Sequence, residues 1–480
     1  MSEYSFGPLL DGKWVDGEGP AFSTFNPARP GEVVGNYRSA GSGQIAQAGR
    51  AARAAQAKWR SLPAAERVKV VGRFLAEVER RSEPIARSIT LEQGKPLAES
   101  RNETAKALGE AAAMAGHVLS GGTERMADAR PGFRNMVTRR PRGVIAAITP
   151  WNFPILTPMR KIAPALMHGN AILLKPSEFT PATVCLIAEA SEGILPPGLL
   201  QVLPGDGRVG AEMVALPEVS GVTFTGSVAT GKRIYALGAQ TLAELSLELG
   251  GKNAAVVNDT DDLDACLDQI AGAAFMCAGQ RCTAISRVIV AEPLRQGVEE
   301  GLAARARAQR QGDGLDEGVT LGPLTSAAQY ARVRDLVEAG RAQGARVVTG
   351  GEAGDDPERN GYFYPATILA DVTPDMGVAR EEIFGPVISV LSYRTLDEAF
   401  ATLNAVDYGL TSALFSNDYR VIQRFVAESE SGMLHVNHGT IPDNHMPFGG
   451  IKDSGVGAYS VGASAANFYT TEHSVYLKAG

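Results

Sequence analysis

One cysteine in this sequence has surroundings that could activate its thiol. Cys282 follows Gly279-Gln280-Arg281, a turn-forming stretch that places a positive charge beside the sulfur. A neighbouring cation favours the thiolate, which is the nucleophilic form of cysteine. Cys185 and Cys266 lie in apolar helical patterns, so we interpret them as core residues. The sequence therefore indicates a thiolate at Cys282, with a small buried hydrophobic residue as the alternative. It assigns no histidine partner of the kind that a Cys-His hydrolase needs.

Two glycine-rich loops have the spacing of phosphate-binding loops. Residues 205–210 match G-x-G-x-x-G, but no Asp or Glu follows at the distance of about twenty residues that ribose binding requires. Residues 226–232 match a Walker A loop, but Arg233 stands where Ser or Thr should bind magnesium. Both loops open predicted helices, whose N-terminal amides favour a pyrophosphate. We expect dinucleotide binding without a standard fingerprint, and a phosphate-loop nucleotide hydrolase is the alternative.

The histidines offer one metal-like pattern, formed by His435, His438 and His445. No cysteine lies near them, and Asp443 is the only adjacent carboxylate. A catalytic zinc normally has three protein ligands in a preformed set. We therefore predict no metal site.

The composition is that of an ordinary globular protein. The 480 residues are 44% hydrophobic and 21% charged, with a net charge of -7, which argues against a nucleic-acid partner. No apolar stretch is long enough to span a bilayer, and the first residues lack the basic and apolar regions of a signal peptide. The four cysteines include no Cys-x-x-Cys pair. We expect a cytoplasmic protein without a membrane partner.

Strand-like runs alternate with helical patterns in two series. The first series has strands at residues 143–148, 171–174, 200–203 and 221–224, and the second has strands at 253–257, 288–290, 347–348 and 387–390. This alternation predicts an α/β fold with two doubly wound domains, in which ligands lie at the carboxyl ends of the strands. We place a dinucleotide-binding domain at 1–121 and 143–250, a catalytic domain at 251–430, and a small β oligomerisation arm at 122–142 and 460–480. An ordinary surface hairpin is the alternative for the arm.

Seven segments resemble those of the aldehyde dehydrogenase superfamily, in the family's order and over nearly the whole chain. They are Thr149-Pro150-Trp151-Asn152-Phe153-Pro154, Leu174-Lys175-Pro176-Ser177-Glu178, Phe224-Thr225-Gly226-Ser227 with Gly231, Leu247-Glu248-Leu249-Gly250-Gly251-Lys252, Gly279-Gln280-Arg281-Cys282, Glu381-Glu382-Ile383-Phe384-Gly385-Pro386, and Pro447-Phe448-Gly449-Gly450-Ile451-Lys452-Asp453-Ser454-Gly455. The resemblance implies the aldehyde dehydrogenase fold and the NAD(P)-dependent oxidation of an aldehyde to a carboxylic acid. It also implies a homo-oligomer, either a dimer or a tetramer.

The resemblance assigns catalytic roles to residues of this chain. Cys282 would add to the aldehyde carbon, Asn152 with the backbone N–H of Cys282 would stabilise the oxyanion, and Glu248 would activate water to hydrolyse the thioester. Lys175 is included in this catalytic set. An acylating relative, which transfers the acyl group to coenzyme A, would lack Glu248.

The same resemblance assigns cofactor contacts, with NAD preferred and NADP as an alternative. Lys175 and Glu178 would hold the adenosine ribose, Ser227 would face the pyrophosphate, Glu382 would bind the nicotinamide ribose and Phe384 would pack beside the nicotinamide. A carboxylate at Glu178 repels a 2′-phosphate, which favours NAD. The remaining predicted contacts are Trp151, Ser177, Gly207, Phe224, Gly226 and Leu249.

The substrate prediction depends on two arginines. Arg160 and Arg281 resemble positions where relatives that act on semialdehydes bind an anion, and Phe448 completes the predicted substrate-binding set. A guanidinium suits a terminal carboxylate, so we expect succinate semialdehyde or an oxo-acid semialdehyde. The alternatives are that both arginines are structural and that the substrate is an apolar or aromatic aldehyde.

The sequence departs from the family pattern at two places. Cys277 stands where Asn is common, and we interpret it as a packing residue, with a regulatory disulfide as the alternative. After Gly457 the usual Arg-Glu pair is replaced by Ala458-Tyr459-Ser460. We interpret this replacement as lying outside the chemistry.

Overall fold

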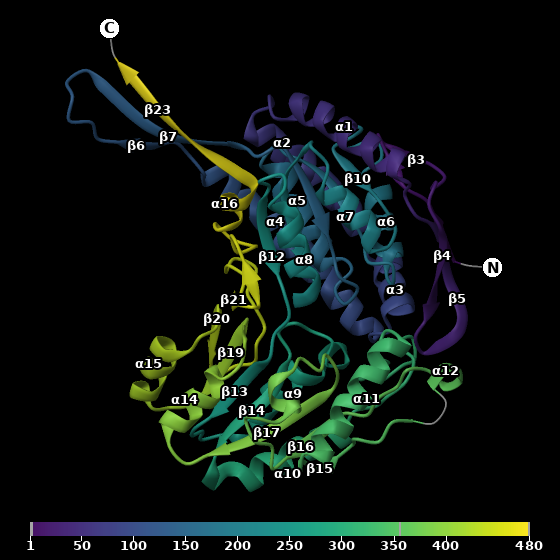
Figure 1. Cartoon of the computed structure of the whole chain (residues 1–480), viewed down its shortest axis with the longest axis vertical. Coiled ribbons are helices and arrows are strands. Elements are labelled where there is room, and N and C mark those ends of the chain that lie inside the picture. Colours follow the sequence, from purple (N-terminus) through teal and green to yellow (C-terminus); the bar gives the residue numbers. More distant parts are fainter. Residues whose placement is uncertain (1–2, 355–356, 479–480) are drawn as a thin grey trace.

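The computed structural model describes residues 3–354 and 357–478, without the side chains of residues 358 and 359. Two α/β units lie against each other, and a long β arm projects from one of them (Figure 1). This is the predicted fold class. Among the described residues, no helix combines the length and apolar character needed to cross a bilayer.

The first unit is built on an eight-stranded sheet. Five central strands run parallel, and the edges are antiparallel. The central strands at 144–148 and 171–175 are buried apolar runs, which are typical of parallel strands covered on both faces. In spatial order the strands are β22 (Gly455–Val456), β12 (Glu244–Glu248), β11 (Val219–Thr225), β8 (Val144–Ile148), β9 (Ala171–Lys175), β10 (Leu200–Val202), β2 (Leu9–Leu10) and β3 (Lys13–Trp14).

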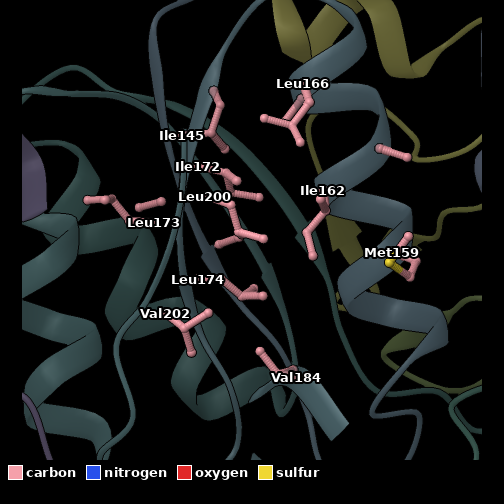
Figure 2. Packing of buried hydrophobic residues seen from close by; sticks show 14 of the residues in the cluster. Ile145, Met159, Ile162, Leu166, Ile172, Leu173, Leu174, Val184, Leu200 and Val202 are labelled. Carbon is pink, nitrogen blue, oxygen red and sulfur yellow. The ribbon is translucent and has the colours of Figure 1, made fainter. Parts of the chain in front are cut away.

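Helices cover both faces of this sheet (Figure 1). They are α1 (Ser42–Trp59), α2 (Ala64–Arg80), α3 (Ser82–Gln93), α4 (Leu97–Ser120), α5 (Leu156–Met167), α6 (Pro181–Glu189), α7 (Gly207–Val214) and α8 (Val228–Gly238). Figure 2 shows side chains of α5, including Ile162 and Leu166, beside residues of β8, β9 and β10 in the core. Each fully buried Leu or Ile side chain contributes about 1.5–3 kcal/mol to folding.

The order of the central strands creates a crevice for a ligand. The chain runs from β8 to β9 and β10 in one direction, then continues on the other side of β8 with β11 and β12. At such a reversal the loops after the two adjacent strands diverge and leave a crevice at their carboxyl ends. Trp151 and Asn152 follow β8, and Gly226 and Ser227 follow β11. The topology thus brings these predicted site residues to one edge of the sheet.

The second unit has a seven-stranded sheet that is parallel except for β15. Its order is β15 (Arg346–Thr349), β16 (Thr367–Ala370), β17 (Val387–Tyr393), β14 (Ile285–Ala291), β13 (Asn253–Val257), β19 (Thr411–Phe415) and β20 (Met433–Val436). Its helices are α9 (Leu263–Phe275), α10 (Arg295–Arg307), α11 (Ala327–Ala342), α12 (Pro357–Asn360), α13 (Gly377–Arg380), α14 (Leu396–Asn404) and α15 (Tyr419–Glu428), with short 3-10 helices η1 (Met276–Gly279) and η2 (Glu292–Leu294).

Three small sheets complete the described part of the fold. They are β1 (Tyr4–Phe6), β5 (Arg29–Arg38) and β4 (Ala21–Asn26); β18 (Tyr408–Gly409) with β21 (Ile451–Lys452); and the arm, formed by β23 (Thr470–Lys478), β7 (Phe133–Pro141) and β6 (Glu124–Met126). The arm projects into open space in Figure 1, and Tyr476 at its tip is 67% exposed. Pairing of the arm with another subunit stays a prediction.

The structure places two domain limits differently from the sequence prediction. The catalytic sheet does not end at residue 430, because β20 adds a further parallel strand to it. The second half of the arm begins at Thr470 rather than at 460, because α16 (Ala465–Tyr469) packs on α5 and β12 of the first unit. The change of sheet near Gly250 falls between β12 and β13. Residues 1, 2, 355, 356, 479 and 480 of the predicted ranges lie outside the described part.

Candidate active site

A cavity of about 870 Å³ lies between the two units. It is lined from the first unit by the loops after β8 and β11 and by the end of β12, and from the second unit by the segment that precedes β14. The sequence-predicted residues that line it are Trp151, Asn152, Arg160, Gly226, Ser227, Glu248, Leu249, Arg281, Cys282, Glu382, Phe384 and Phe448. One space therefore contains most of the predicted catalytic, cofactor and substrate positions.

Cys282 is held by its backbone in the segment between η1 and β14. The Asn253 side chain donates from Nδ2 to the carbonyl oxygens of Cys282, at 2.7 Å, and Ala284, at 2.9 Å. A Cβ atom at Gly251 would lie 2.7 Å from the Cys282 oxygen, so only glycine fits there. These contacts come from β13 and the residues just before it, so the second sheet determines where the thiol lies.

The thiol of Cys282 is not activated in the way that the sequence suggested. Burial raises the pKa of Cys282 to about 12, and the Glu248 carboxylate acts in the same direction. Arg160 and Arg281 lower this pKa, but their effect is smaller than the burial effect. In the protein without cofactor, desolvation therefore opposes the predicted preference for thiolate beside Arg281, because low-dielectric surroundings disfavour the charged form more strongly than the two cations favour it.

Asn152 is fixed by contacts that the sequence did not indicate. Lys95 donates from Nζ to the Asn152 carbonyl oxygen at 2.6 Å and to Glu103 Oε2 at 2.7 Å, and both side chains are almost fully buried. The Cys277 thiol lies 3.8 Å from the same carbonyl oxygen. The Asn152 side chain donates from Nδ2 to the Gln280 carbonyl at 2.8 Å, which directs the amide toward the segment containing Cys282.

Cys277 occupies a sharply turned segment. It has a positive φ of 57°, as does Ala278 at 51°, and such values are uncommon for residues other than glycine. Burial raises the pKa of the Cys277 thiol to about 11, with Lys95 opposing the shift. Both Cys277 and Cys282 are free thiols in this structure. A redox role for Cys277 stays a prediction.

Glu248 ends β12 and is almost completely buried. Thr225 donates to Glu248 Oε2 at 3.1 Å, and the Ser460 hydroxyl donates to Oε1. The segment Ala458-Tyr459-Ser460 therefore does not lie outside the site, as the sequence suggested, because Ser460 contacts the predicted base directly. Lys161 is also near: burial lowers its pKa to about 8, and the Glu248 carboxylate opposes this shift.

The N-terminus of α8, where the sequence predicts a pyrophosphate, opens onto the cavity. Ser227 caps this helix by accepting from Thr230 N at 3.3 Å. A Cβ atom at Gly226 would lie 2.4 Å from the ring of Phe224, so a glycine is required beside this ring. Lys232 pairs with Asp453 at 2.6 Å on the rim. Free amides at a helix N-terminus can receive a phosphate.

Glu382 and Phe384 also line the cavity. Glu382 accepts from Gly251 N at 2.9 Å, and burial raises its pKa. Phe384 makes an edge contact with Trp151, with 5.4 Å between ring centroids, although the two rings come from different units. The Glu382 carboxylate is placed to accept hydrogen bonds from a ribose, and the two aromatic side chains are placed to pack against a further aromatic ring.

Five predicted cofactor residues lie outside the cavity lining among the described residues. One is Phe224 in β11, and the other four lie at the carboxyl end of β9 and the start of α7. Lys175 pairs with Glu178 at 3.3 Å, and Ser177 lies between them in sequence. Gly207 begins α7, whose N-cap is already occupied by the Asp206 carboxylate. These positions fit ribose binding better than catalysis, so the catalytic role of Lys175 gains no support from its place.

Both predicted anion-binding arginines contact protein groups. Arg160 donates from Nε and Nη2 to the two oxygens of Glu110, each at 2.9 Å, and its guanidinium lies 4.3 Å from the centre of the Phe448 ring. Arg281 donates to Thr283 Oγ1 at 3.1 Å and to two backbone carbonyls. These contacts agree with the alternative that both arginines are structural. Both side chains nevertheless line the cavity.

Lys106 was missed by the sequence analysis. It lines the cavity beside Arg160, lies 3.7 Å from Glu110 and donates to the Pro442 carbonyl at 2.6 Å. Two cations thus share the one carboxylate of Glu110. Within residues 3–354 and 357–478, no group of three His, Cys, Asp or Glu side chains is placed to hold a metal ion.

Comparison with known proteins identifies the family and the fold. The model of the aldehyde dehydrogenase family matches residues 14–475. The chain belongs to the aldehyde dehydrogenase family. As a member, it is an oxidoreductase that acts on aldehydes, and the phosphate-loop hydrolase alternative is set aside.

Individual relatives match this chain over almost its whole length. A betaine aldehyde dehydrogenase from Cereibacter sphaeroides is 37% identical over 482 residues, covering 98% of this chain and 97% of the relative. An alpha-ketoglutarate semialdehyde dehydrogenase from Haloferax volcanii is 36% identical over 475 residues, covering 97% and 98%. The crystal structure of an NAD-dependent aldehyde dehydrogenase from Sinorhizobium meliloti superposes with a TM-score of 0.96 and 34% identity, covering 100% of this chain and 95% of the other.

Proposed function

We propose that this aldehyde dehydrogenase oxidises a short semialdehyde to the diacid with NAD, through a covalent intermediate on Cys282. The observation that carries the proposal is that Cys282, Asn152 and Glu248 line one cavity together with the amino end of α8. A nucleophile, an oxyanion donor, a base and a phosphate-binding helix end are the parts that the reaction requires.

The reaction begins with addition of the Cys282 sulfur to the aldehyde carbon. The thiol proton passes to solvent, and the positive charges of Arg160 and Arg281 favour this loss. As the carbon–sulfur bond forms, the carbonyl oxygen gains negative charge, and the Asn152 amide donates to it in place of the Gln280 carbonyl. The product of this step is a thiohemiacetal.

When bound, NAD would supply the acceptor for the hydride that leaves the thiohemiacetal carbon as the thioester forms. Ser227 and the amides of α8 would hold its pyrophosphate, Glu382 one ribose, and Lys175 with Glu178 the other. Glu248 then takes a proton from a water molecule that attacks the thioester carbon, so that the acid leaves and the Cys282 thiol is restored. The hydroxyls of Thr225 and Ser460 hydrogen-bond to this carboxylate and orient it.

The preference for NAD over NADP rests on Glu178. Its side chain is 42% exposed beside Lys175. A carboxylate accepts hydrogen bonds from ribose hydroxyls and repels a 2′-phosphate, while a single lysine that is already paired compensates only in part. The similar Sinorhizobium meliloti protein is NAD-dependent.

The charge of the cavity favours an anionic substrate over a quaternary ammonium. The relatives act on both kinds, because betaine aldehyde carries a cation and alpha-ketoglutarate semialdehyde a carboxylate. A cation site needs open aromatic faces. Here Arg160 covers the ring of Phe448 and Lys95 covers that of Phe153, each at 4.3 Å. Lys106 adds a further cation.

A kinetic panel tests this proposal. The purified enzyme is assayed with NAD and NADP against aldehydes of matched length that end in a carboxylate, a methyl group or a trimethylammonium group. We expect the highest kcat/KM with NAD and the carboxylates. Arg281→Ala and Arg160→Met should each raise KM for the carboxylates more than for the neutral aldehydes, with Arg160→Lys retaining part of the preference. Equal effects of the substitutions on both classes of aldehyde would refute the anion pocket. A higher kcat/KM with the trimethylammonium aldehyde would show that the cavity selects cations instead.

A further inference from the structure

We propose that Ser460 is a positioning residue for deacylation, because its hydroxyl and that of Thr225 hold the two oxygens of the Glu248 carboxylate in a fixed orientation. The inference rests on the proposed role of Glu248 as the base. It assigns a function to a segment in which this chain departs from the family pattern, Ala458-Tyr459-Ser460.

Each carboxylate oxygen of Glu248 receives one hydroxyl hydrogen bond. Thr225 Oγ1 donates to Oε2 at 3.1 Å, and Ser460 Oγ donates to Oε1. Thr225 comes from β11, and Ser460 comes from the chain more than 200 residues later, so two segments that are distant in sequence hold the carboxylate. Rotation about the last side-chain bond would break both contacts. Each oxygen keeps further lone pairs for a water molecule in the cavity.

Ser460 itself is fixed by the backbone. Its N–H and carbonyl oxygen exchange hydrogen bonds with the carbonyl oxygen and N–H of Phe448, at 2.9 and 2.7 Å. The chain turns immediately afterwards at Val461 and Gly462, which both have positive φ values. A Cβ atom at Gly462 would lie 2.4 Å from the His445 oxygen, so this turn requires glycine. The hydroxyl of Ser460 is therefore presented by a rigid pair of segments.

This backbone pairing joins the base to the substrate side of the cavity. Phe448 lines the cavity and lies against the Arg160 guanidinium. Ser460 lies directly opposite Phe448 and contacts Glu248. One short bridge thus positions both an aromatic wall of the substrate pocket and the base that hydrolyses the thioester.

Loss of the Ser460 hydroxyl should slow deacylation without affecting acylation. A hydrogen bond to a charged group accounts for about tenfold or more in an equilibrium or rate. We expect Ser460→Ala to lower steady-state kcat about tenfold while the first turnover keeps its rate, so that a burst of about one NADH per active site appears. Ser460→Thr keeps the hydroxyl and should restore most of the turnover.

The test compares these variants by rapid mixing of the full-length enzyme with NAD and aldehyde. Ser464→Ala is the matched control, because it removes a buried hydroxyl of the same segment that has no hydrogen-bond partner among the described residues. It should behave as the wild type. Glu248→Ala should show the burst with a larger loss of turnover, and adding Ser460→Ala to it should have no further effect, because Ser460 acts through Glu248.

The outcomes separate the two proposals. If Ser460→Ala matches Ser464→Ala while Glu248→Ala is slow, the positioning role is overturned and the base role stands. If Glu248→Ala turns over like the wild type, the base role fails and the inference fails with it. Equal losses of the first turnover and of kcat in Ser460→Ala would indicate a general structural defect and would also overturn the inference. Ser460→Cys, of similar size but a weaker donor, replaces Ser460→Ala if that variant does not fold.

Discussion

The buried pair formed by Lys95 and Glu103 offers the most quantitative test of how Asn152 is positioned. Lys95 makes three contacts: an ion pair with Glu103 at 2.7 Å, a hydrogen bond to the Asn152 carbonyl at 2.6 Å and a cation–π contact with the Phe153 ring at 4.3 Å. Lys95→Met keeps the length of the side chain but removes all three. It also leaves the Glu103 carboxylate buried without a cation.

The expected loss of stability in Lys95→Met depends on the hydrogen bonds that Glu103 keeps. Removing one partner of a buried ion pair typically destabilises a protein by about 3–5 kcal/mol. Glu103 still accepts from the backbone N–H groups of Ile155 and Leu156, each at 3.1 Å, so we expect the lower end of the range, about 3 kcal/mol. Glu103→Gln in the same chain removes the uncompensated charge and keeps an acceptor for these N–H groups. The double variant should therefore recover more than half of the loss.

Urea unfolding at neutral pH, followed by both tryptophan fluorescence and far-UV circular dichroism, measures these differences. Activity provides a second readout, because a displaced Asn152 carbonyl shifts the oxyanion donor, so both variants should have lower kcat even where stability recovers. A loss below about 1 kcal/mol for Lys95→Met, or a double variant no more stable than the single one, would refute the reasoning.

Three further predictions follow from burial and packing. Because the pKa of Cys282 is about 12, the thiolate fraction rises tenfold with each pH unit below that value. In the protein without cofactor, iodoacetamide should therefore alkylate Cys282 about tenfold faster for each pH unit between 7 and 10, with Cys282→Ser as the control. A plateau of the rate below pH 9 would contradict the burial effect. Burial raises the pKa of Glu92 from 4.5 to about 7, so the folded state holds this proton more tightly than the unfolded state. The protonated carboxyl therefore contributes about 3 kcal/mol to the free energy of unfolding at low pH, and this contribution should be lost as pH rises from about 4.5 to about 7. Glu92→Gln should show a flatter dependence of unfolding free energy on pH over this window, and an unchanged slope would count against a buried, protonated Glu92. Gly251→Ala should abolish activity by displacing Cys282, because its methyl group would lie 2.7 Å from the Cys282 oxygen; full activity in the folded variant would show that the loop can move aside.

The sequence predicted the elements that are uniformly apolar. Strands β8, β9, β10 and β11 lie where the buried runs indicated them, because parallel strands covered on both faces need continuous apolar sequence. Strand β12 was missed, although it carries Glu248. Its sequence, Glu244 to Glu248, begins and ends with a carboxylate, and only tertiary pairing with β11 and β22 makes it a strand.

The site residues were predicted by resemblance, and the contacts between them required the structure. Lys95, Lys106 and Ser460 lie far from Asn152, Arg160 and Glu248 in sequence, and no spacing rule connects them. The charge state of Cys282 was inferred from its neighbour Arg281 alone, but burial depends on the packing of both units around the thiol and outweighs that neighbour. Sequence patterns indicate chemical types, whereas desolvation and distant hydrogen bonds come only from the folded chain.

The most direct test of the covalent mechanism is the mass of the enzyme during turnover. Glu248→Ala is mixed with NAD and a semialdehyde, quenched in acid after the burst and digested for mass spectrometry. The account predicts that the peptide containing Cys282 gains the mass of the acyl group, and that Cys282→Ser in the same background shows no adduct. Full NADH release with no acyl mass on Cys282, or with the acyl group on another residue, would contradict it.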